Sequence, residues 1–383
     1  MIRIIDKSKC SGCHACMVAC PKQCIKMLSD NEGFLYPFVD ENVCVDCGAC
    51  DKVCPYHNVV SEKKQNPKAY AAISKDECVL LNSSSGGVFS LLAKKIISDG
   101  GVVFGAIFDE NFNVKHHYVT NIEDLGKLRG SKYVQSEIGT TYKDAENYLK
   151  DGKSVLFTGT PCQILGLKSY LNKEYENLIT QDIICHGVPS PMVWGKYVKY
   201  RSALAGASAR RIFSRHKKYG WKRYSASFTF ENDAEYLCQF DCDPFMRSFL
   251  KNLCLRPSCY YCNSNGDKRV SDITLADFWG IENVDAQMYN VNGTSLVVVN
   301  TDKGEKLLKE IQKDLIIKEE SLSDAVKFNP CYSKSVVMPK EREGFMKSIV
   351  DCGFVEAYNK YAKESTKTKI KNILRRIKRK LFR

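Results

Sequence analysis

Apolar runs alternate with segments of helical spacing through the first half of the chain. Buried strands are predicted at AYAAI (69–73), VVFGAIF (102–108), SVLFTG (154–159) and LITQDIIC (178–185). Between them, residues 87–98 and QILGLKSYL (163–171) have the periodicity of helices. Strand and helix in alternation predict an α/β core with a largely parallel sheet. Beyond residue 200, SASFTF (225–230) and SLVVVN (295–300) predict added β structure.

The last residues combine an apolar stripe with strong positive charge. Residues 365–383 hold nine Lys and Arg and no acid, so a net charge of +13 falls to +4 without them (13 − 9 = 4). Ile370, Ile373, Leu374, Ile377 and Leu381 recur at helical spacing, which predicts a basic amphipathic helix over 363–383. An anionic membrane surface suits such a helix, and a solubilising tail or a nucleic-acid arm is the alternative. We favour the membrane surface, because phosphate binding does not require the apolar stripe.

Two cysteine runs with one spacing occupy the N-terminal region: CSGCHACMVACP (10–21) and CVDCGACDKVCP (44–55). Nineteen cysteines in a chain with no signal-peptide core and no membrane-spanning run predict a cytoplasmic protein whose thiols are free or bind metal. Zinc sites usually take two separated Cys-x-x-Cys pairs, whereas three closely spaced cysteines followed by Cys-Pro are typical of a dicluster ferredoxin. The fourth cysteine of each run then binds the cluster of the other run. The predicted ligands are Cys10, Cys13, Cys16 and Cys54 for one 4Fe-4S cluster, and Cys44, Cys47, Cys50 and Cys20 for the second.

Cys24 lies outside this spacing and is interpreted as a free structural thiol. The ferredoxin-type domain is predicted to span residues 1–60, with a polar linker at 61–68. The core follows in two parts, 69–150 and 151–345.

Three further motifs in the core have two possible interpretations each. Serines and glycines directly precede a predicted helix in SSSGGVFSLLAKKI (83–96). This arrangement suits either an anion site or a simple helix cap. Cys162 and Cys185 follow strands at one sheet edge, and with Cys259 and Cys262 they form either a third metal centre or ordinary buried thiols. DFWG (277–280) offers an aromatic pair for a flat ring, or plain core.

The basic stretch RRIFSRHKKYGWKRY (210–224) suits an anionic substrate or a solvated surface strand. Nucleic acid is the less favoured partner, because the excess charge lies mostly in the tail.

Taken together, the motifs resemble the beta-subunit family of coenzyme F420 hydrogenases and dehydrogenases. SSSGGVFSLLA, LRGSKYVQS, GTPCQILGLK, CHGVPSPMVWGKY, RPSCYYC and DFWG occur in the order found in that family, and the resemblance covers residues 1 to about 340. It implies a noncovalent FAD that passes electrons between a hydride carrier and iron-sulfur clusters. The implied fold is an α+β ferredoxin-like dicluster domain followed by an α/β flavin-binding core with added β structure.

The resemblance also implies roles for particular residues. The FAD diphosphate would be bound by Ser84, Ser85, Gly86 and Gly87, with Ser131, Lys132 and Tyr133 nearby, and Thr160 and Pro161 would shape the loop beside the flavin ring. Cys162, Cys185, Cys259 and Cys262 would bind a third 4Fe-4S cluster, for which Cys254 is a substitute ligand. His186 and Lys132 are the candidate catalytic groups.

Two functions follow from these expectations. The first is an oxidoreductase with its own substrate in polysaccharide or cofactor metabolism, supplied by F420, ferredoxin or NAD(P)H. The second is an electron-transfer subunit that serves a separate redox partner protein. The resemblance leaves both open.

Overall fold

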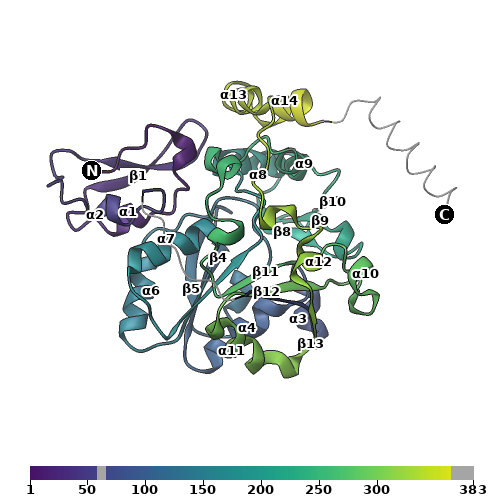
Figure 1. Cartoon of the computed structure of the whole chain (residues 1–383). Helices are drawn as coiled ribbons and strands as arrows, with labels where there is room; N and C mark the ends of the chain where they lie inside the picture. The colour runs from purple at the N-terminus through teal and green to yellow at the C-terminus, as the bar shows by residue number, and fades with distance from the viewer. Residues whose placement is uncertain (58–65, 364–383) are drawn as a thin grey trace.

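The computed structural model describes residues 1–57 and 66–363, in which a small N-terminal domain lies beside a larger core (Figure 1). The predicted helix over 363–383 and most of the predicted linker at 61–68 lie outside the described residues. Within the described part, no helix combines the length and apolarity needed to cross a bilayer.

One eight-stranded sheet forms the centre of the core. Its four inner strands β11, β7, β6 and β4 are parallel, whereas β12, β13 and β5 run antiparallel to their neighbours. The expectation of a largely parallel sheet is therefore wrong at both margins, because a buried apolar run does not encode the direction of its strand. In spatial order the strands are β13 (Leu315–Glu320), β3 (Lys68–Ser74), β12 (Ser295–Val299), β11 (Ile273–Asp277), β7 (Leu178–Ile183), β6 (Val155–Thr158), β4 (Val102–Phe108) and β5 (Val114–Val119).

Helices cover both faces of this sheet, and alternate residues of each strand pack on opposite sides. Val103 and Leu156 face one hydrophobic cluster, while Phe104 and Phe157 face another. The first cluster includes α4 (Val88–Ser98), α5 (Leu125–Leu128) and α11 (Asp302–Ile311), and the second includes α6 (Thr141–Lys150) and α7 (Pro161–Leu171). Smaller helices of the core are α3 (Glu77–Leu81), α10 (Ile281–Val284) and α12 (Leu322–Val326).

A further layer of helices and a three-stranded antiparallel sheet lies above the carboxyl edge of the large sheet (Figure 1). The predicted strand 225–230 is confirmed as β9. Trp194, Tyr197 and Phe345 are among the buried residues that join these elements into one hydrophobic cluster. The elements are α8 (Pro191–Ala205), β8 (Ala209–His216), β9 (Ser225–Phe230), β10 (Glu235–Gln239), α9 (Pro244–Leu250), α13 (Arg342–Cys352) and α14 (Phe354–Ala357).

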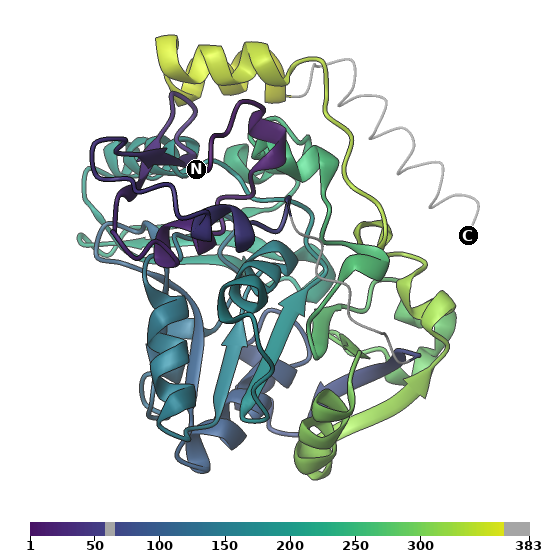
Figure 2. The ribbon, with the colours of Figure 1, turned by 60° about the vertical axis from the view of Figure 1, so that its left-hand side comes forward.

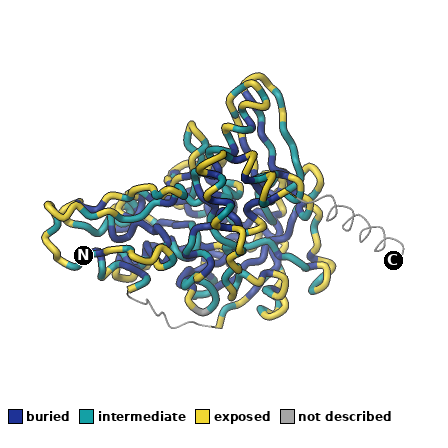
Figure 3. The backbone as a smooth tube through the Cα atoms, turned by 90° about the horizontal axis from the view of Figure 1, so that it is seen from above, coloured by how far each residue is buried: buried dark blue, intermediate teal, exposed yellow. Residues whose placement is uncertain are grey.

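The N-terminal domain consists of an antiparallel hairpin and two short helices. These are β1 (Ile25–Ser29), β2 (Leu35–Val39), α1 (Ala15–Val18) and α2 (Ala49–Lys52). Helix α1 packs against α7 of the core, and Figure 2 shows the purple N-terminal domain above the strands of the large sheet. Figure 3 shows that exposed backbone gathers at the outer end of this domain, whereas buried backbone lies toward the core.

Candidate functional site

The first predicted cluster set lies together in the N-terminal domain. Cys10, Cys13, Cys16 and Cys54 line one pocket, although Cys54 belongs to the other run. Burial raises the pKa of the Cys13 thiol to about 12, so the free thiol stays protonated until a metal replaces the proton. The structure therefore brings the fourth cysteine across from the second repeat, as the spacing predicted.

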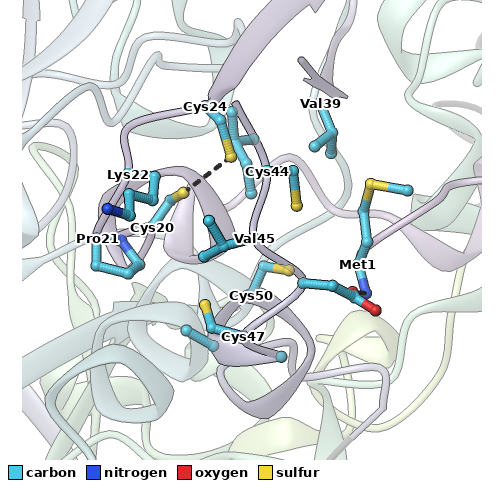
Figure 4. Close-up of a pocket in the computed structure, with 14 residues that line it drawn as sticks. Met1, Cys20, Pro21, Lys22, Cys24, Val39, Cys44, Val45, Cys47 and Cys50 are labelled. Carbon is cyan, nitrogen blue, oxygen red and sulfur yellow. Dashed lines mark hydrogen bonds and ion pairs between the residues drawn. The ribbon is translucent and has the colours of Figure 1, made fainter. Parts of the chain in front are cut away.

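The second set lines a separate pocket, in which Cys20 joins the cysteines of the second run (Figure 4). Cys47 is exposed, whereas its counterpart Cys13 is buried. Cys24 also lines this pocket, and its Sγ lies 3.3 Å from Cys20 Sγ. The free thiol of our interpretation is thus a neighbour of the predicted ligands, not a remote core residue.

Both runs turn through the left-handed region in the same places. His14 (φ 65°) precedes α1, and Gly48 (φ 72°) precedes α2. A backbone amide from the start of the chain also approaches this region, because Ile2 N donates to Cys50 Sγ at 3.3 Å. In the described part of the chain, no three His, Cys, Asp or Glu side chains close on a point that a single metal ion would occupy. A four-iron cube is larger than one ion, so its thiolates lie farther apart.

The third predicted set gathers at the carboxyl edge of the sheet. Cys162 lies in the first turn of α7, Cys185 follows β7, and Cys259 and Cys262 belong to the segment around the short helix Pro257–Tyr261. Cys185 is half-buried, and desolvation together with the Cys259, Cys162 and Cys262 thiols raises its pKa. Val188 N donates to Cys259 Sγ at 3.4 Å, and Thr160 Oγ1 lies 3.2 Å from Cys162 Sγ. These four thiols are therefore neighbours, and a backbone N–H is directed at one of them.

Cys254 is not among these thiols, because it packs in the hydrophobic cluster of the upper layer. A different cysteine, Cys331, lies close to them. Burial raises the pKa of the Cys331 thiol, with a further contribution from Cys262. Its Sγ is 3.8 Å from His186 Nδ1, and His186 Nε2 is 2.7 Å from Asn252 Oδ1. Cys331 has no neighbouring cysteine in the sequence, so spacing gave no signal for it.

The first and third sets adjoin across the boundary between the N-terminal domain and α7. A Cβ on Gly166 would lie 2.8 Å from Cys13 Cβ and 3.0 Å from Cys13 Sγ, so only glycine allows this approach. Burial is the main cause of the raised pKa of Cys13, but the Cys162 thiol also contributes. The two sets are thus adjacent, with no intervening layer of side chains at Gly166.

The serine-glycine loop precedes α4, as predicted, but the structure explains much of it by packing. Ser85 Oγ donates to Thr294 O at 3.0 Å, and Ser131 N donates to Ser84 Oγ at 2.9 Å. A Cβ on Gly86 would lie 2.3 Å from Ala72 O of β3, and Gly87 has φ +91°. These contacts hold the loop against the sheet and against the GSKY segment.

Lys132 is a half-buried residue of this GSKY segment. Its Nζ donates to Arg129 O at 3.0 Å and to Gly130 O at 3.3 Å. Burial lowers the pKa of Lys132 to about 7, so the amine is close to half-protonated at neutral pH. It therefore braces the loop 128–130 and has no contact with His186, the other candidate catalytic group.

A group of buried aromatic and charged residues lies beside Tyr133. Arg215 of β8 pairs with Asp277 and donates to the Tyr133 hydroxyl at 3.3 Å. Its Nε and Nη2 are buried and have no hydrogen-bond partner among the described residues. Trp279 stacks on Trp221, with ring centroids 5.0 Å apart, whereas Phe278 is ordinary core. The basic stretch 210–224 is therefore not wholly a solvated strand, since part of it turns inward.

The chain combines two regions that match known protein families. Residues 152–325 match the model for the C-terminal region of the coenzyme F420 hydrogenase/dehydrogenase beta subunit, and residues 9–59 match the 4Fe-4S dicluster domain. No curated protein matches the chain. It is similar to a chain of the xenon-derivatized F420-reducing NiFe hydrogenase complex from Methanosarcina barkeri, with 16% identity over 78% of this chain and 92% of that chain and a TM-score of 0.48.

The two family matches confirm the resemblance that the motifs predicted. The chain is an iron-sulfur protein of electron transfer that resembles F420 hydrogenase beta subunits, a family of oxidoreductase components.

Proposed function

We propose that the chain is an iron-sulfur flavoprotein oxidoreductase that moves electrons between a reducible substrate or hydride carrier, FAD and three 4Fe-4S clusters. The arrangement of three cysteine sets carries this proposal. The first set adjoins the third across Gly166, and the third lies at the sheet edge where ligands bind in α/β folds. A path for single electrons therefore leads from that edge to the surface at Cys47.

The donors beside Tyr133 suit a flavin. FAD, when bound, accepts two electrons as a hydride and releases them singly. Nε and Nη2 of Arg215 are buried donors without an acceptor among the described residues, and an electron-rich ring edge supplies such acceptors. The Arg215 guanidinium lies over the Tyr224 ring at 4.2 Å, which holds it in place. Ser131 and Tyr133 would position the cofactor, while Lys132 would brace the loop beneath it.

The exposure of Cys47 favours one alternative, an electron-transfer subunit without a substrate of its own. In that case electrons would pass between the second cluster and a separate catalytic protein. Native purification with a stoichiometric partner, and no turnover by the chain alone, would favour this alternative.

Anaerobic purification followed by an absorption spectrum and iron determination tests the proposal. We expect flavin bands and about twelve iron atoms per chain. Arg215→Gln should lose flavin and keep iron, whereas Arg210→Gln, which changes an exposed arginine of the same strand, should keep both. An iron-loaded protein without flavin would contradict the proposal. Reduction assays with deazaflavin, nicotinamide and ferredoxin donors then identify the electron donor.

A further inference from the structure

Arg256 is a fully buried arginine whose guanidinium reaches from the core into the N-terminal domain. Its Nε donates to Cys10 O at 2.7 Å, and its Nη2 donates to Leu35 O at 2.9 Å and lies 3.6 Å from Cys10 Sγ. Nη1 donates to Gln135 Oε1 at 3.0 Å. Each of the three guanidinium nitrogens therefore has an acceptor, and Nη2 is also directed at the sulfur of a predicted cluster ligand.

The surroundings of Arg256 include no carboxylate partner among the described residues. Its acceptors are carbonyl and amide oxygens and a sulfur, and its guanidinium lies 4.2 Å from the centre of the Tyr36 ring. The ion pairs found within residues 1–57 and 66–363 do not involve it. A buried cation is costly unless a negative charge compensates it. That charge has to come from a group that the side chains alone do not supply.

A second buried arginine provides the contrast. Arg342 also joins the core to the N-terminal domain, where its Nη1 and Nη2 donate to the two oxygens of Glu32 at 3.0 and 2.6 Å. It also donates to Leu255 O, the residue before Arg256. Both arginines thus fasten the domain at nearly the same place, and only Arg342 has its own carboxylate within the described part of the chain.

We propose that Arg256 is the fixed counter-charge of the first cluster and makes that cluster easier to reduce than the second. The inference rests on the proposed function, because it requires a cluster bound by Cys10, Cys13, Cys16 and Cys54. A cluster with four thiolate ligands is negative, and it becomes one unit more negative when reduced. A guanidinium beside Cys10 Sγ therefore stabilises the reduced form more than the oxidised form.

With the cofactors bound, one electron would enter the first cluster from the reduced flavin by way of the third cluster, and the same electron would leave to the second cluster. No proton accompanies it at Arg256, because a guanidinium keeps its charge at any ordinary pH. Arg256 therefore favours an electron on the first cluster over one on the second.

Redox titration of the full anaerobic chain, monitored by electron paramagnetic resonance, tests this inference. Arg256→Gln should lower the equilibrium constant for reduction of one cluster at least tenfold. For a single electron, this lowers the reduction potential by about 59 mV. The cluster is identified as the one whose signal changes in Cys13→Ser. In Arg256→Lys the reduction potential of the first cluster should stay close to that of the unmodified chain. Lysine keeps the positive charge, although it lacks the planar guanidinium. The double variant Glu32→Gln/Arg342→Gln removes the other ion pair between the core and the N-terminal domain without a net change of charge. It should leave the reduction potentials of all clusters unchanged.

The results distinguish an effect of the positive charge of Arg256 from an effect of its packing between the core and the N-terminal domain. Unchanged potentials in Arg256→Gln would overturn the inference. Loss of the first cluster in Arg256→Gln, with retention in Arg256→Lys, would support it, as iron content shows. Equal loss in both variants would overturn it in favour of packing. A wild-type chain without any iron-sulfur signal would contradict the proposed function itself, which separates the two failures.

Discussion

The two cysteine runs share one spacing, but their surroundings are opposite. At the second position after the first cysteine, the first run has Gly12 and the second has Asp46. A Cβ on Gly12 would lie 2.8 Å from Arg256 Nη1, whereas Asp46 is exposed and pairs with the N-terminal amine. The first run is adapted to the core, and the second is adapted to solvent. Equivalent ligand sets can therefore differ in potential without any difference between the ligands.

The same contrast recurs at the turn before each short helix. His14 occupies the left-handed position in the first run, where Gly48 stands in the second. His14 is buried, and its Nδ1 has no hydrogen-bond partner in the described part of the chain. A glycine is sufficient for the turn alone. The histidine is thus a further residue that distinguishes the inner run from the outer one.

Substitution of a single cysteine ligand in either run should have the largest effect, because it removes or alters one cluster. Because the fourth ligands cross over, Cys54→Ser should lose the same cluster as Cys13→Ser, and Cys20→Ser the same cluster as Cys47→Ser. Each variant should lack about four iron atoms, or carry an altered cluster, with the matching resonance changed. Iron analysis and low-temperature resonance spectra check this. If Cys20→Ser instead matched Cys13→Ser, each run would hold its own cluster.

A methyl group on one left-handed glycine of each run should give a smaller difference. Gly48→Ala meets no atom within 4 Å, so only the left-handed backbone opposes it, at about 1–2 kcal/mol. Gly12→Ala carries the same backbone cost and also displaces Arg256, so the free energy of unfolding should fall further. Anaerobic urea unfolding of both variants measures the difference. Equal losses would mean that Arg256 moves aside freely.

A third effect concerns pH. Burial, followed by the charge of Arg256, lowers the pKa of His14 to about 3, whereas an unfolded histidine titrates near 6.5. Between these values the unfolded state binds more protons, so stability falls as pH falls, by about 1.4 kcal/mol per pH unit. His14→Asn, which tolerates the left-handed turn, should flatten this slope between pH 6.5 and 5. Urea unfolding at both pH values checks it, and an unchanged slope would assign the acid sensitivity to other groups.

Much of the local structure was predictable from the sequence. VVFGAIF matches β4 residue for residue, and residues 87–98 include the whole of α4, because periodicity reflects burial directly. The Cys-Pro at the end of each run predicted that its fourth cysteine joins the ligand set of the other run. The structure brings the same cysteines together.

Contacts between distant segments were not predictable. The role of Arg256 depends on Cys10, which is 246 residues away, and Cys331 approaches His186 across 145 residues. Neither contact leaves a spacing in the sequence. Arg215 lay in a stretch that suited either an anionic substrate or a solvated strand, since composition does not show which residues of a strand turn inward.

The tie between Glu32 and Arg342 joins residues that are 310 positions apart in the chain. During synthesis, the N-terminal domain leaves the ribosome long before Arg256 and Arg342 exist. We therefore expect the pocket of Cys10, Cys13, Cys16 and Cys54 to receive its iron and sulfide before the core docks against it. The exposed Cys47 predicts that the outer set stays accessible after docking.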